Sequence, residues 1–150
     1  MERTFKIIYT SDTHGHIFPV NYAAGCGESS GLLNLAAQID KNGNTLVLDG
    51  GDSLQGTPLV QYYLAHADEF SHHPVAEAFN AMGCDYFTLG NHDFNFGYDA
   101  LRAYLCAMDG VCLCANVQDL GGALPLLPET VHTLKNGLRI GITGIVTDYV

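Results

Sequence analysis

The sequence has neither a long apolar run nor an apolar leader. None of its hydrophobic stretches approaches the roughly 20 residues that a helix needs to cross a bilayer, which excludes a transmembrane helix. The first residues, Met-Glu-Arg-Thr-Phe, lack the apolar region of a signal peptide. We therefore expect no membrane segment, and no secretory leader unless one has already been removed.

Positive charge is also scarce. Lysine and arginine together number 6 against 16 acidic residues, which gives a formal net charge of −10. A nucleic-acid polymer is therefore excluded as the natural partner, because no basic surface offsets the repulsion of its phosphates. A small phosphorylated substrate stays possible if bound metal reverses the local charge.

The cysteines are too few and too scattered for a disulfide framework. There are five, an odd number, at positions 26, 84, 106, 112 and 114. Cys112 and Cys114 would lie on one face of a strand, since strand side chains repeat every second residue. We expect buried, reduced core thiols rather than a metal or redox site.

No internal repeat, low-complexity tract or linker divides the 150 residues, a length that suits one domain with one core. Short apolar runs alternate with helix-like stretches, which is typical of α/β folds. Strands are expected at residues 5–10, 45–48, 85–89 and 111–115, and helices at residues 32–39, 58–64, 74–82 and 98–108. Asn136-Gly137, between two further apolar segments at 130–134 and 138–146, predicts a hairpin.

Three of these strands end in polar turns rich in possible ligands. The first runs into Asp12 and His14, the second into Asp52, and the third into Asn91 and His92. In open α/β sheets, ligands bind at the carboxyl ends of strands, so the three turns are expected at one edge of the sheet.

The residue types in these turns suit a divalent metal. Carboxylate and imidazole together favour Mn, Zn, Fe or Co, an Asn oxygen adds a neutral ligand, and His titrates near neutrality as an acid should. Each turn alone also has a plain structural explanation, as a chance pair, a helix cap or a hydrogen-bonded loop. Asp49, which precedes two glycines, fits a structural role equally well and is left out of the site.

Taken together, the three motifs resemble those of the calcineurin-like metallophosphoesterases, which show D-x-H, then G-D, then G-N-H-[DE]. The residues in and around these motifs are similar in particular to those of the 5′-nucleotidase and 2′,3′-cyclic-nucleotide phosphodiesterase family. The matching stretches are residues 9–16, 49–52, 55–56, 89–94, 115–117 and 139–147. The resemblance implies the N-terminal half of a four-layer α/β/β/α sandwich, with metal-binding loops at the C-terminal ends of strands.

The resemblance also implies roles for individual residues. Two divalent ions are expected, the first bound by Asp12 and His14, and both bridged by Asp52. Asn91 would bind the second ion and help to hold a phosphate oxygen. His92 would bind no metal but would stabilise or protonate the phosphate ester, while the ions activate a water.

One position departs from the nucleotidase pattern. Many such nucleotidases have a carboxylate three residues after the catalytic histidine, where this chain has Asn95. An amide supports a cationic imidazole less well than a carboxylate does. The context of Asn95, Phe96, Gly97 and Tyr98 favours the cyclic phosphodiesterase branch.

The later histidine motifs of the family and its base-stacking C-terminal domain have no counterpart in residues 1–150. We therefore expect an N-terminal piece of a longer protein that carries about half of a dinuclear site. Alone, it is expected to bind metal weakly, to have little activity and to self-associate through an open sheet.

Two other functions stay open: a non-catalytic metal- or phosphate-binding fragment, and a same-fold hydrolase of other phosphate or sulfur esters. The remaining histidines fit no motif. His16 is expected to have a supporting role in a loop beside the site, with contact to the substrate as the alternative. His72 and His73 are expected at an exposed helix start. The cellular location stays open as well. Relatives of this kind are often periplasmic or at the cell surface, but this sequence shows no signal peptide.

Overall fold

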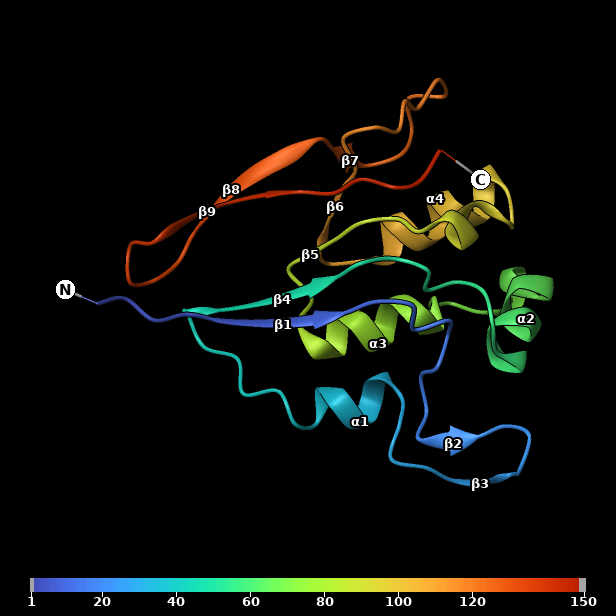
Figure 1. Ribbon diagram of the computed structural model, residues 1–150. Helices are drawn as coiled ribbons and strands as arrows, with labels where there is room; N and C mark the ends of the chain where they lie inside the picture. The colour runs from blue at the N-terminus through green and yellow to red at the C-terminus, as the bar shows by residue number, and fades with distance from the viewer. Residues whose placement is uncertain (1, 149–150) are drawn as a thin grey trace.

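A five-stranded parallel sheet forms the centre of the computed structural model, which describes residues 2–148 (Figure 1). Its strands, in spatial order, are β1 (Lys6–Thr10), β4 (Thr45–Asp49), β5 (Tyr86–Phe87), β6 (Val111–Leu113) and β7 (Leu126–Leu127). Two antiparallel hairpins accompany the sheet, β2 (Val20–Asn21) with β3 (Cys26–Gly27), and β8 (Glu129–Thr133) with β9 (Arg139–Thr143). The predicted α/β class and the hairpin at Asn136-Gly137 are confirmed.

The helices begin and end where the sequence provides signals. They are α1 (Leu32–Ala36), α2 (Pro58–Ala65), α3 (Pro74–Met82) and α4 (Tyr98–Ala107), with two 3₁₀ helices, η1 (Ala67–Glu69) and η2 (Asn91–Phe94). Proline occupies the first turn of α2 and α3, where its missing N–H costs nothing, and Gly83 ends α3 in the left-handed conformation at φ 69°. No helix within residues 2–148 has the length and apolar character needed to span a membrane.

Several elements differ from the sequence-based expectations. Helix α1 ends at Ala36 rather than near residue 39, because the chain tightens into 3₁₀-type bonds such as Ile39 N–H to the Ala36 carbonyl, at 3.2 Å. Strands β5 and β6 are shorter than predicted. Strands β2, β3 and β7 have two residues each, too few to show any periodicity in the sequence.

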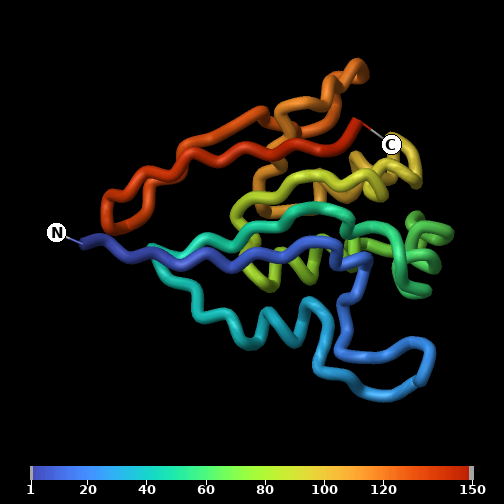
Figure 2. The backbone as a smooth tube through the Cα atoms, in the orientation of Figure 1, coloured from blue at the N-terminus to red at the C-terminus, as the bar shows by residue number. Residues whose placement is uncertain are grey.

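The main core lies between the sheet and its helices. Val47 and Phe87 of the sheet pack with Phe79 of α3 and Tyr104 of α4, and all four are buried. Figure 2 shows α3 on one side of the sheet and the β8–β9 hairpin on the other. This packing fixes the strands and therefore the loops at their carboxyl ends.

The edge strand β1 exposes apolar side chains, with Ile7 at 47% and Tyr9 at 63% exposure. An open apolar edge of this kind was expected from the sequence. Self-association through it stays a prediction.

The cysteines only partly follow the prediction of a buried set. Cys84, Cys112 and Cys114 are buried, and burial raises the pKa of the Cys84 thiol to about 12, which keeps it protonated and unreactive. Cys26 and Cys106 are exposed, so the prediction is wrong for them. Cys26 lies on the small β2–β3 hairpin and Cys106 on the outer side of α4, and neither element encloses its side chain.

The expected exposed helix start at His72 and His73 is also half wrong. His72 is exposed, but His73 is only 4% exposed and packs against the rings of Tyr63 and Tyr104. Its Nδ1 accepts a hydrogen bond from the backbone N–H of Ala76, at 3.4 Å, and so caps α3. Burial lowers the pKa of His73 to about 4.

This burial predicts a pH dependence of stability. At pH values between the ordinary pKa of histidine and the lowered pKa of His73, this side chain is protonated in the unfolded chain but neutral in the folded one. The free energy of unfolding therefore falls as the pH falls. We expect the free energy of unfolding of the wild type, relative to His73→Asn, to drop by about 2 kcal/mol from about pH 7.5 to about pH 5. Asparagine keeps a capping side chain but does not titrate.

Urea denaturation across this pH range measures the difference, with His72→Asn at the exposed neighbour as the matched control. If the difference in the free energy of unfolding between wild type and His73→Asn stayed constant across this pH range, the assignment of His73 as a buried neutral ring would be contradicted.

Candidate metal centre

The loops after β1 and β4 are joined by backbone hydrogen bonds directly beyond the sheet. The N–H of Asp12 donates to the Gly51 carbonyl and that of His14 to the Asp52 carbonyl, both at 2.9 Å. Thr10 pairs with Asp49 at the last position of the β1–β4 ladder, so the two loops leave the sheet at the same level. The register therefore brings the first two predicted motifs side by side.

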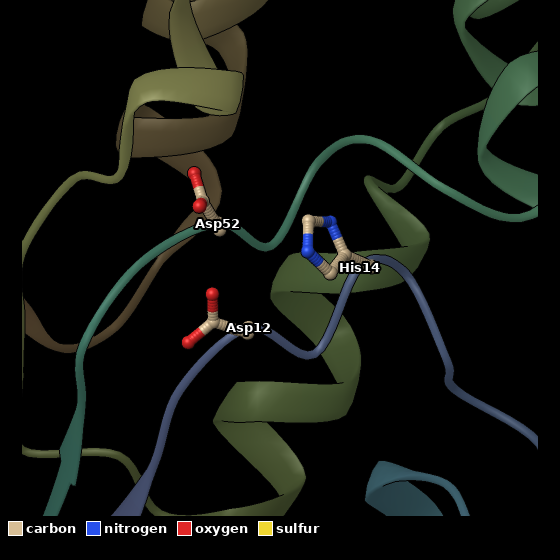
Figure 3. A group of neighbouring side chains, drawn as sticks. All are labelled: Asp12, His14 and Asp52. Atoms are coloured by element: carbon tan, nitrogen blue, oxygen red, sulfur yellow. The ribbon is translucent and has the colours of Figure 1, made fainter.

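Three of the predicted metal ligands meet in these loops. The side chains of Asp12, His14 and Asp52, here called the carboxylate–imidazole cluster, offer ligand atoms that all lie within 4.8 Å of one another. Figure 3 shows the three side chains projecting from the two loops into a common space.

The same three residues have a strained backbone. Asp12, His14 and Asp52 have φ angles of 53°, 47° and 59°, and within residues 2–148 no other residue except glycine has a positive φ. This conformation disfavours L side chains and persists only where the surroundings impose it. The strain coincides with the ligand atoms, which is the distribution expected of a functional site.

The hydrogen bond of His14 leaves one ring nitrogen available. Its Nδ1 lies 2.7 Å from the backbone carbonyl of Gln55, and a carbonyl can only accept, so Nδ1 carries the proton. The Nε2 lone pair is then available to a cation, the arrangement usual for metal-bound histidines. Two carboxylates and one such imidazole fit a divalent transition metal or zinc.

Asp93, to which the sequence analysis gave no role, connects the second and third motifs. Its carboxylate is fully buried and accepts four backbone N–H groups at 2.9 Å, from Asp52, Ser53, Leu54 and Gly90. Burial raises the pKa of Asp93, while these four bonds act in the opposite direction. The spacing of the Gly-Asn-His-Asp motif alone could not reveal this role, because three of the four partners lie about 40 residues away.

Asp49 also supports the loop that follows β4. Its carboxylate accepts hydrogen bonds from the Thr10 hydroxyl at 2.6 Å, the Gly51 N–H at 3.0 Å and the Ser53 hydroxyl at 3.2 Å. Burial raises the pKa of Asp49 to about 6. These contacts give Asp49 a structural role in the turn.

The third motif lies beside the cluster. The backbone N–H of His92 donates to Oδ1 of Asp52 at 2.8 Å, and the His92 ring centre lies 5.6 Å from that of His14. Asn91 is half-buried at the start of η2, and no hydrogen bond within residues 2–148 engages its side chain. Asn95 approaches His92 through its side-chain amide, with Nδ2 3.0 Å from Nδ1. The structure thus brings together Asp12, His14 and Asp52, with His92 beside them, and shows no contact of the Asn91 side chain with this group among the described residues.

His16 lies on the same loop but faces another neighbour. Its ring packs edge-on against Tyr22 at 5.7 Å, which agrees with a role in the loop.

Comparison with known proteins shows the family to which the chain belongs. The Calcineurin-like phosphoesterase family model matches residues 5–146. The chain is 32% identical to the trifunctional nucleotide phosphoesterase protein YfkN of Bacillus subtilis, over 94% of this chain and 11% of that protein. It is 31% identical to the 2′,3′-cyclic-nucleotide 2′-phosphodiesterase/3′-nucleotidase of Salmonella typhimurium, over 94% of this chain and 24% of that protein.

A crystal structure of calcineurin-like phosphoesterase YfkN from Bacillus subtilis superimposes with a TM-score of 0.78, covering 93% of this chain and 47% of that one. The chain thus spans a quarter or less of the curated relatives named above. The matched region contains the whole carboxylate–imidazole cluster and the central parallel sheet. The chain therefore belongs to the calcineurin-like phosphoesterase family.

Proposed function

We propose that this chain carries the N-terminal part of the active site of a metal-dependent phosphoesterase acting on nucleotides or 2′,3′-cyclic nucleotides. The observation that carries the proposal is the cluster of Asp12, His14 and Asp52 on strained loops. The relatives are a nucleotide phosphoesterase and a cyclic-nucleotide phosphodiesterase/nucleotidase by name, which agrees with a phosphorylated nucleotide as substrate.

In this proposal, Asp12, His14 and Asp52 hold one divalent ion, and Asp52 with Asn91 contributes to a second. The ions, when bound, would activate a water and offset charge on the phosphate. His92 stands beside this position and donates a proton to the leaving oxygen or a hydrogen bond to the phosphate. Asp49 and Asp93 hold the backbone of the loops and touch no substrate.

The neutral amide beside His92 departs from the nucleotidase pattern and so points to a branch of the family. Asn95 stands where a carboxylate would stabilise a cationic imidazole, and its amide lies 3.0 Å from the ring. We propose that the enzyme favours the cyclic phosphodiester over the phosphate monoester.

The test compares 2′,3′-cyclic AMP with 5′-AMP as substrates of the full-length gene product, in manganese and in chelator. We expect metal-dependent turnover with the higher kcat/KM on the cyclic ester, and an Asn95→Asp variant that gains less than about threefold on the monoester, since this position is not what limits monoester turnover. A large monoester gain in Asn95→Asp would contradict the substrate preference. Metal binding without turnover of either ester would favour a non-catalytic binding role instead.

A further inference from the structure

Gln55 contacts His14 directly through its backbone and reaches His92 through its side chain and Asn95. It lies half-buried in the loop that follows Asp52 and precedes α2. Its backbone carbonyl accepts the hydrogen bond from His14 Nδ1, at 2.7 Å. Its side-chain oxygen accepts a short hydrogen bond from Nδ2 of Asn95.

The Asn95 amide nitrogen has a second hydrogen, and the geometry shows where it goes. Nδ2 of Asn95 lies 3.0 Å from Nδ1 of His92, which is in position to accept it. A neutral imidazole that accepts at Nδ1 carries its proton on Nε2. The chain of contacts from Gln55 through Asn95 therefore specifies the tautomer of His92.

The two rings consequently have opposite tautomers. His14 carries its proton on Nδ1, and its free Nε2 is an electron-pair donor. His92 carries its proton on Nε2, which is a hydrogen-bond donor. The ring centres lie 5.6 Å apart with planes at 61°, so one acceptor and one donor nitrogen are offered close together.

We propose that Gln55 is a positioning residue that fixes both rings: His14 through its backbone carbonyl, and His92 through its side chain and Asn95. What the rings then do, bind metal and donate to the phosphate ester, rests on the proposed function. The proposal explains how a site with Asn95 in place of a carboxylate still presents a donor nitrogen on His92. A carboxylate at position 95 would instead accept from Nδ1 and favour the opposite tautomer.

The two contacts of Gln55 can be separated by mutation. Gln55→Met removes the side-chain amide but keeps the backbone carbonyl and the chain length. Gln55→Glu restores an oxygen that accepts from Asn95. Gln61→Met changes an exposed glutamine on α2 and is the matched control.

The readout is the tautomer of each ring in the metal-free chain, from long-range proton–nitrogen NMR correlations at a pH where both rings are neutral. In the wild type we expect His14 to be protonated at Nδ1 and His92 at Nε2. Gln55→Met should shift the His92 nitrogens toward a mixture of tautomers and leave His14 unchanged. Gln55→Glu should restore the wild-type His92 signals, and Gln61→Met should change neither ring.

A wild-type His92 protonated at Nδ1 would overturn the proposal before any variant is made. So would a Gln55→Met variant whose His92 signals match the wild type. Because neither metal nor substrate enters this measurement, a failure of the proposed hydrolysis leaves its result standing. In the full-length gene product, Gln55→Met should lower kcat about tenfold with KM little changed, and Gln55→Glu should recover most of the loss.

Discussion

Replacing His92 by alanine should lower kcat of the full-length gene product on cyclic nucleotides about 10²–10³-fold, the usual loss when one hydrogen-bond donor to the transition state is removed. The ring lies 5.6 Å from that of His14 and is supported by Asn95, so alanine removes the donor that faces the substrate position. The backbone N–H of residue 92, which donates to Asp52 at 2.8 Å, is retained. Metal affinity should therefore change little.

Steady-state kinetics together with a metal titration separates these effects. His72→Ala, at an exposed position directly before the capping residue His73, is the control and should keep full activity. A His92→Ala variant as active as His72→Ala would remove His92 from the chemistry. Equal losses of activity and metal affinity would instead make His92 a ligand.

Asp93→Asn should lower the free energy of unfolding by about 3 kcal/mol. Each carboxylate oxygen of Asp93 accepts two backbone N–H groups, Oδ1 from Ser53 and Leu54, and Oδ2 from Asp52 and Gly90. An asparagine oxygen can keep one of these pairs, but its NH₂ group would face the other pair, donor against donor. Two buried N–H groups would then be left without acceptors.

Urea denaturation at neutral pH measures this loss, and Asp40→Asn at an exposed position controls for the removal of one negative charge. The Asp93→Asn variant should also bind metal more weakly, because the Asp52 loop loses its anchor. If Asp93→Asn and Asp40→Asn were equally stable, the four backbone bonds would not anchor the loop in solution.

The parts of this molecule that the sequence predicted depend on local patterns. Alternating apolar runs and turn residues located β1, β4, the helices that start at Pro58 and Pro74, and the Asn136-Gly137 hairpin. Because parallel strands end at one edge, the convergence of Asp12, His14 and Asp52 followed from their positions after strands.

What the sequence could not reveal depends on contacts between distant segments. The burial of His73 comes from Tyr63 and Tyr104, which lie on other helices. The roles of Asp93 and Gln55 come mainly from partners about 40 residues away, and an aspartate or glutamine carries no local sign of such partners. A sequence signal was present only in the adjacency of Asp93 to the Asn91-His92 pair.

The most direct test of the account is a calorimetric titration of the purified chain with manganese or zinc, beside Asp52→Asn and the matched Asp40→Asn control. The account predicts weak binding of one ion per chain, at least tenfold weaker in Asp52→Asn, because that change removes a charged ligand from the cluster, and unchanged in Asp40→Asn. If wild type and Asp52→Asn bound metal with the same affinity and stoichiometry, the carboxylate–imidazole cluster would not be the metal centre.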